Sequence, residues 1–409
     1  MKKSVLKNYA KLIVRTGVNV QQGQDVVINA SVEDAYFVEY VVEAAYQAGA
    51  REVTVDWSFQ PLTKLAYQYE SIKTLAELPA WFLKKREHRV KTLPATIHII
   101  SEDPDGLSGI DQAKLLEVQK KVGPVLMKYR EQMDNKFQWT IVGIPGEKWA
   151  KKVFPNLNKK QAINALWDAI LKVTRVYGDP IKNWQEHNEN LALKTKTLND
   201  LGIKTLYYKS KNGTDFTVDI HKDMNFLAGG ETTYGGVFYN PNMPTEECFT
   251  SPVKTSAHGV VMATKPLSVR GVLVEDFGFR FEKGKVVEVL CKNNEYKDVL
   301  TKLVSTDEGA AMLGEVALVP YDSPINQTEL LFYNTLYDEN ACCHLAIGRA
   351  FNECIRDYQN KSEEEIKALD LNTSMIHVDF MIGSEDLSIL AETFDGKKVQ
   401  IFENGTWAI

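Results

Sequence analysis

The sequence predicts two domains: an α/β N-terminal domain with a largely parallel sheet over residues 1–195, and a mixed α+β C-terminal domain over residues 196–409 that carries a metal site. Three observations predict this organisation. The chain has 409 residues, more than one ordinary core accommodates. Helix and strand signals alternate in the first half, whereas short strands with turn sequences dominate from about Leu201 onwards.

The first half reads as strands separated by helices. Apolar residues at helical spacing predict helices over residues 2–16, 31–49, 62–69, 71–89 and 110–134. Short β-branched runs predict strands over residues 25–30, 51–57, 96–100 and 139–144. This alternation indicates a parallel sheet covered by helices. No Gly-rich loop follows any of these strands, so a nucleotide site is not supported.

A polar helical stretch is predicted over residues 156–199, and after it the pattern changes to short strands with turn sequences. Strands are predicted over residues 204–209, 215–220, 259–264 and 271–289, the last of them a hairpin turning at Lys283-Gly284. The turn Asn212-Gly213 separates the first two strands. Consecutive strands joined by tight turns indicate antiparallel sheets.

Composition excludes several classes of function. Net charge is −6 and no basic block occurs, which argues against nucleic acid as a partner. No run of 18 apolar residues exists, and the lysines among the first 16 residues indicate an amphipathic helix rather than a signal peptide, so no membrane partner is expected. The five cysteines show no C-x-x-C spacing, which favours reduced thiols in a cytoplasmic compartment.

The segment 376–380 is the most informative for function. It is short, apolar and β-branched, and Gly383 follows it, so it is predicted to be a strand. Residues i and i+2 of a strand point to the same face, which places His377 beside Asp379. An imidazole and a carboxylate fixed on one rigid strand form half of a metal site.

Three further segments carry charged side chains beside apolar runs. Glu246 and Glu247 precede apolar residues, and by period 2 at most one of them is expected to enter a site. Glu315 begins a nearly continuous apolar strand, where a buried carboxylate needs a partner. His344 lies in an apolar stretch that is predicted to form the first turns of a helix.

Two interpretations of this set are open. Cys342 and Cys343 precede His344, so a Cys–His nucleophile is one of them, although buried cysteine is usually inert and packing is favoured. In the other, two imidazoles and three carboxylates provide the ligands for two divalent ions that share a bridging group. Without thiolate ligands an iron–sulfur cluster is excluded, and zinc, cobalt or manganese fits.

At these segments the sequence closely resembles the metalloaminopeptidases that include aminopeptidase T and aminopeptidase S, and the likeness runs essentially end to end. The matching strings are NMPTEECFTSP (242–252), TDEGAAMLGEVALVPYDSPI (306–325), LLFYNTLYDENACCHLAIGRAF (330–351) and HVDFMIGSEDL (377–387). The resemblance implies a two-domain homodimer that removes N-terminal residues from peptides with a free N-terminus, using two divalent ions, zinc or cobalt first and manganese as a further option. It implies metal ligands at Glu247, Glu315, His344, His377 and Asp379.

The chain departs from the family pattern at one position. The family has a tyrosine seven residues after the histidine at position 344, and this chain has Phe351. Phenylalanine lacks the hydroxyl that donates a hydrogen bond. Either Tyr333 or Tyr337 supplies the group, or turnover is reduced, since a lost transition-state hydrogen bond costs ~10²–10³ in rate.

The expected reaction is hydrolysis of the first peptide bond by an activated water, with Glu246 or Glu247 as the catalytic base. Two alternatives remain. One is another two-metal hydrolase, such as an amidohydrolase or phosphatase; a phosphate-binding Arg cluster near the ligands would favour it, and Arg349 and Arg270 alone give weak support. A non-catalytic or weakly active metal-binding homologue is the other, because of Phe351.

Overall fold

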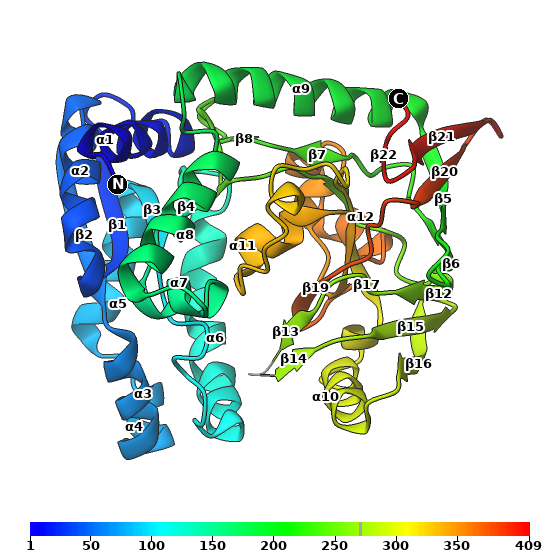
Figure 1. Ribbon diagram of the computed structural model, residues 1–409, viewed down its shortest axis with the longest axis horizontal. Coiled ribbons are helices and arrows are strands. Elements are labelled where there is room, and N and C mark those ends of the chain that lie inside the picture. Colours follow the sequence, from blue (N-terminus) through cyan, green and yellow to red (C-terminus); the bar gives the residue numbers. More distant parts are fainter. Residues whose placement is uncertain (270–271) are drawn as a thin grey trace. The chain divides into compact units, whose positions relative to one another are not determined.

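The computed structural model describes residues 1–269 and 272–409 (Figure 1). The chain forms two compact units, Met1–Glu186 with Gly230–Pro244, and His187–Gly229 with Thr245–Ile409. The units change over within helix α9 (Pro180–Leu201). The domain boundary at residue 195 stays a prediction. Arg270 and Gly271, named in the sequence analysis, lie outside the described residues.

A parallel sheet of order β10-β4-β3-β1-β2 forms the centre of the first unit. Its strands are β1 (Asp25–Ser31), β2 (Glu52–Ser58), β3 (Ala95–Ile100), β4 (Trp139–Gly143) and β10 (Asn242–Met243), and a separate pair is formed by β8 (Glu231–Thr232) and β9 (Phe238–Tyr239). The predicted α/β fold with a parallel sheet is confirmed. Strand β10 was not predicted, because two residues give no periodicity to detect.

Helices alternate with the strands of this sheet along the chain. They are α1 (Lys3–Leu12), α2 (Ala35–Gln47), α3 (Gln60–Tyr69), α4 (Ile72–Ala76), α5 (Ala80–Thr92), α6 (Gln112–Met133), α7 (Glu147–Val153) and α8 (Lys159–Val173). The rings of Tyr9, Phe37 and Trp167 lie 5.6–6.3 Å apart, which joins α1, α2 and α8 through one aromatic cluster. The single helix expected over residues 71–89 is two helices, because Pro79 disfavours helical backbone at the residue before it and caps α5.

The second unit is built on two antiparallel sheets. The larger has the order β16-β15-β12-β6-β5-β20-β21-β22, and the smaller has the order β19-β18-β17-β11-β7. The larger contains β5 (Ile203–Lys209), β6 (Asp215–Asp219), β12 (His258–Met262), β15 (Phe277–Glu282), β16 (Lys285–Cys291), β20 (Ser388–Thr393), β21 (Lys398–Glu403) and β22 (Thr406–Trp407). The smaller contains β7 (Leu227–Ala228), β11 (Cys248–Thr250), β17 (Leu313–Leu318), β18 (His344–Gly348) and β19 (His377–Met381).

The remaining elements of this unit are the pair β13 (Leu267–Val269) and β14 (Val272–Val274) and the helices α10 (Asn294–Val304), α11 (Thr335–Asp338) and α12 (Glu363–Ala368). The mixed α+β second half predicted from turn sequences is therefore confirmed. Among the helices that the structure describes, none combines the length and apolar character needed to cross a membrane.

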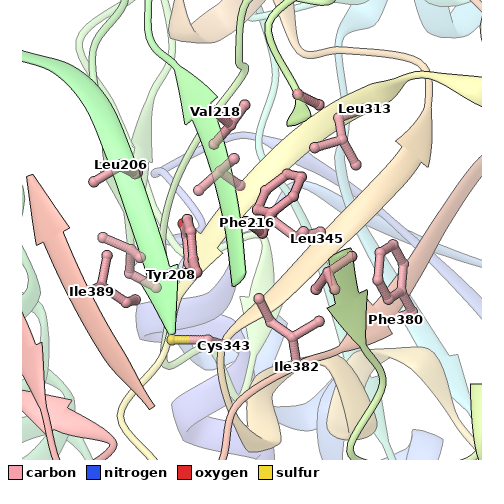
Figure 2. Packing of buried hydrophobic residues seen from close by; sticks show 14 of the residues in the cluster. Leu206, Tyr208, Phe216, Val218, Leu313, Cys343, Leu345, Phe380, Ile382 and Ile389 are labelled. Atoms are coloured by element: carbon pink, nitrogen blue, oxygen red, sulfur yellow. The ribbon is translucent and has the colours of Figure 1, made fainter. Parts of the chain in front are cut away.

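The core of the second unit lies between its two sheets. Figure 2 shows Leu345 and Phe380 of the smaller sheet among side chains of the larger one, including Leu206 on β5 and Phe216 on β6. All four side chains are at most 1% exposed. One face of the smaller sheet therefore packs in the apolar core, and polar side chains can gather on the opposite face.

Candidate metal centre

Strands β17, β18 and β19 lie side by side, and each alternates between two kinds of residue. Val316, Leu345, Ile347 and Phe380 point into the core between the sheets. Because neighbouring residues of a strand face opposite ways, the residues between them share the other face. The set on that second face is Glu315 and Ala317 on β17, His344, Ala346 and Gly348 on β18, and His377, Asp379 and Met381 on β19.

The register of the three strands places two carboxylates on either side of a small residue. Glu315 lies opposite Ala346, and Ala346 lies opposite Asp379. A methyl group in the middle of this row leaves space between the carboxylates. Gly348, opposite His377, has φ +108°, and a Cβ there would come within 2.1 Å of the Ile376 carbonyl oxygen. The backbone therefore approaches closely where the imidazole is held.

The predicted position of His344 on a helix is wrong. Helix α11 ends at Asp338, a 3₁₀ turn covers Glu339–Ala341, and His344 is the first residue of β18. The run from 344 to 348 alternates small or polar with large apolar residues, but over so few residues periodicity does not separate a buried strand from a helix. The adjacent Cys342 and Cys343 are buried free thiols that precede this strand.

Five side chains expected from the sequence converge into two overlapping groups. Glu247, directly before β11, joins Glu315 and His344 in the first, and Glu315 joins His377 and Asp379 in the second. Within each group the ligand atoms lie within 4.8 Å of one another. Glu315 belongs to both, which is the arrangement that a bridging carboxylate between two cations would require.

The closest contacts in these groups join histidine Nε2 atoms to carboxylates. His344 Nε2 lies 3.3 Å from Glu247 Oε2, and His377 Nε2 lies 3.0 Å from Glu315 Oε2. The other ring nitrogen of His377 donates to the Arg349 carbonyl at 2.7 Å. That bond fixes the tautomer and aims Nε2 at the carboxylates, as is usual for metal-binding histidine.

Charge and burial perturb the titration of these groups. Burial opposes protonation of His344, but the Glu247 carboxylate and its acidic neighbours raise the pKa of that imidazole to about 10. Burial likewise opposes protonation of His377, whose pKa Asp379 and Glu315 raise to about 11. Burial raises the pKa of Glu315 to about 7, with the Glu247 charge adding to the effect and His377 opposing it. The carboxylates of this centre therefore favour positive charge beside them, either on the two imidazoles or on bound cations.

A divalent ion would complete the surroundings of one carboxylate oxygen. Asp379 Oδ1 is buried and makes no hydrogen bond within the part of the chain that the structure describes, although His377 Nε2 lies 3.3 Å away. Buried polar atoms are nearly always hydrogen-bonded, so a buried carboxylate oxygen that has an ion-pair contact and no hydrogen bond needs an explanation. Carboxylate oxygens with imidazole nitrogens form a donor set for zinc, cobalt or manganese. The residues present thus fit the predicted ions.

Glu246 is placed differently from Glu247. Both are buried, but Glu246 is in neither ligand group. Its backbone N–H donates to Asn340 Oδ1 at 2.7 Å, and its Oε2 lies 3.9 Å from His187 Nε2. His187, which also contacts the Thr245 carbonyl, was not predicted, because its polar helical surroundings gave no signal.

Glu339 is a further residue that sequence reasoning missed. Burial raises the pKa of its carboxyl group well above the usual value, and the charges of Asp379 and Glu247 add to the shift. It lines a cavity together with Asp379 and Tyr333. Its position in a run of acidic and polar residues, Tyr337–Asn340, concealed it, since such a run is usually a solvated turn.

The two tyrosines considered as hydroxyl donors occupy different environments. Tyr337 is fully buried and stacks on Phe332 at 4.8 Å, whereas Tyr333 lines the cavity beside Asp379. Phe351 packs its ring 4.8 Å from that of His377. The ring expected at the centre is therefore present without a hydroxyl, and Tyr333 is the tyrosine of the two that faces the cavity.

Comparison with known proteins identifies the family. The family described as thermophilic metalloprotease (M29) matches residues 2–407. Aminopeptidase AmpS of Bacillus subtilis is 45% identical over 405 residues, 98% of each chain, and Aminopeptidase T of Thermus thermophilus is 37% identical over 409 residues, covering 99% of this chain and 98% of that one. The solved structure of wild-type AmpT from Thermus thermophilus matches with a TM-score of 0.91 at 36% identity, covering 100% of both chains. The chain therefore belongs to the thermophilic metalloprotease (M29) family.

Proposed function

We propose that this protein is a metal-dependent aminopeptidase that hydrolyses the N-terminal peptide bond of peptides with a free N-terminus. The observation that carries the proposal is the convergence of two carboxylate–imidazole groups on one sheet face, with Glu315 common to both. The names of the relatives, aminopeptidases AmpS and T, support the same reaction class.

The proposed ligands are Glu247, Glu315 and His344 for one ion, and Glu315, His377 and Asp379 for a second. Zinc or cobalt suits this mixture of nitrogen and oxygen donors best, and manganese is a further option. Ions held in this way lower the pKa of a bound water towards 7 and polarise a peptide carbonyl.

The protein's own residues supply the rest of the reaction. Glu246, buried beside the first group but outside it, is the proposed base that takes a proton from the attacking water. Glu247 is the alternative base, in which case it ligates less tightly. Tyr333 is the proposed hydrogen-bond donor that replaces the hydroxyl absent at Phe351. Side-chain preference is expected to be broad, the protein cytoplasmic, and the working form a homodimer.

The test is hydrolysis of paired peptides, identical except for N-acetylation, by protein first stripped of metal and then supplied with Zn²⁺, Co²⁺ or Mn²⁺. The proposal predicts release of the first residue from the unblocked peptide alone, and only with metal. Glu315→Gln should lose both ions, whereas the exposed His258→Ala should keep them, by elemental analysis. Folded, metal-loaded protein that cleaves neither peptide would instead favour the non-catalytic homologue.

A further inference from the structure

A cavity of about 120 Å³ adjoins the metal centre within the second unit. Its lining is mixed: the acidic side chains of Asp338, Glu339 and Asp379 and several other polar residues face it together with the apolar side chains of Leu267, Leu331 and Met381. Asp379 belongs to the second ligand group, and its Oδ1 is the buried oxygen without a hydrogen bond. A molecule that fills this cavity therefore touches the centre of the proposed chemistry.

Strand β19 determines how the cavity meets the centre. Met381 follows Asp379 by two residues, so the two side chains share a face of the strand. Met381 also lies directly opposite His344 in the antiparallel pair, and it is 4% exposed. Met381 therefore borders the cavity and lies next to two of the proposed metal-ligand residues, His344 and Asp379.

The lining and the volume of the cavity indicate which kind of side chain can fill it. Pro266, Leu267, Leu331 and Met381 form an apolar part of the wall, and an apolar side chain placed against that part would release water, while polar residues line the rest of the cavity. A cavity of about 150 Å³ in another protein holds a benzene ring, so the space here is slightly smaller than that. A leucine or methionine side chain fits it, an alanine leaves it part empty, and an indole is too large.

The acidic part of the lining indicates which residue of a peptide enters. In a peptide with a free N-terminus, the ammonium group and the first side chain are attached to the same carbon. A pocket in which the acidic side chains of Asp379 and Glu339 offer oxygen acceptors beside an apolar part of the wall matches both groups at once. The side chain after the scissile bond carries no such charge beside it.

Given the aminopeptidase function proposed above, we propose that this cavity binds the side chain of the substrate's N-terminal residue and that Met381 limits its size. Methionine is unbranched and adaptable, so it admits several medium-sized side chains rather than one. Within a broad preference, the enzyme accordingly favours leucine or methionine over tryptophan at the first position.

The experiment compares kcat/KM for the unblocked tripeptides Leu-Ala-Ala, Ala-Ala-Ala and Trp-Ala-Ala. Met381→Ala enlarges the cavity and should raise the Trp/Leu ratio about 10-fold or more, a usual effect of changing pocket size. Leu331→Trp fills the cavity and should lower the Leu/Ala ratio by a similar factor. Met224→Ala, another buried methionine of this unit outside the cavity, is the matched control and should leave both ratios unchanged.

Binding of L-leucinol, measured by calorimetry on each metal-loaded variant, gives a second readout that does not depend on turnover. It should weaken in Leu331→Trp and persist in Met224→Ala. Equal changes for all three peptides, or a changed preference only at the second residue, would overturn the subsite. Should Met381→Ala fail to fold, Leu331→Trp decides. A parent enzyme inactive on every peptide would overturn the proposed function itself, and the subsite with it.

Discussion

Loading the metal-free protein with a divalent ion should expel protons, because the histidines proposed as ligands are charged before metal binds. The pKa of His344 is raised to about 10 and that of His377 to about 11. At pH 8 both imidazoles are therefore protonated, and each must lose its proton to offer Nε2 to a cation. At least two protons per chain should leave, and because each ion has one histidine among its proposed ligands, the affinity for each ion should rise ~10-fold per pH unit between pH 7.5 and 9.

Calorimetric titration of Zn²⁺ in two buffers with different ionisation enthalpies measures this release. His377→Ala should release about one proton fewer, whereas His258→Ala, an exposed histidine outside the ligand groups, should match the parent. Uptake of zinc with less than one proton released at pH 8 would refute the proposed charge state of the centre.

The same shifts fix how stability depends on pH in the metal-free protein. The folded pKa values of His344 and His377 lie above the ordinary value of about 6.5, so folded protein holds more protons than unfolded protein above that pH. The stabilisation is fully present below about pH 6.5 and is lost as the pH rises through 10 to 11. Urea unfolding of chelator-treated protein should show this decline.

Three further results are expected. Ala346→Leu should abolish metal uptake, measured by elemental analysis, while circular dichroism stays that of the parent, because the larger side chain fills the space between two carboxylates; full metal content would contradict this. Tyr333→Phe should lower kcat by ~10²–10³, whereas Tyr337→Phe, buried in a ring stack, should not, and equal losses would remove Tyr333 from the proposed chemistry. Asp34→Asn should raise the free energy of unfolding by about 1–3 kcal/mol at pH 8 and little at pH 4. Burial raises the pKa of Asp34 to about 6 although Ser101 donates to its carboxylate at 2.6 Å, so the charged form present at pH 8 costs stability that a neutral amide does not. A loss of stability at pH 8 would contradict this.

The sequence predicted the first unit well because its strands and helices are long enough to show their periods. The helix expected over residues 110–134 is α6 (Gln112–Met133), and the strand expected over residues 25–30 is β1 (Asp25–Ser31). The break at Pro79 was missed because apolar spacing continues through it. Periodicity reports which face is apolar, whereas a local backbone restriction decides where a helix ends.

The site was predictable where one strand sets the geometry and not where tertiary packing does. His377 and Asp379 are i and i+2 on β19, and their Nε2 and Oδ1 atoms lie 3.3 Å apart, as the strand period requires. The row that places Ala346 between two carboxylates depends on strand register across long loops, which no local pattern encodes. Glu339 lies in a 3₁₀ turn and His187 in the distant helix α9, and tertiary packing brings both near the centre, so local sequence patterns could not identify them.

The most direct test of the proposed metal centre is anomalous scattering from crystals grown with Zn²⁺ or Co²⁺. The proposed ligands predict two peaks per chain, one among Glu247, Glu315 and His344 and one among Glu315, His377 and Asp379, each about 2.0–2.2 Å from its ligand atoms. Peaks elsewhere, or none at these side chains in fully loaded protein, would contradict it.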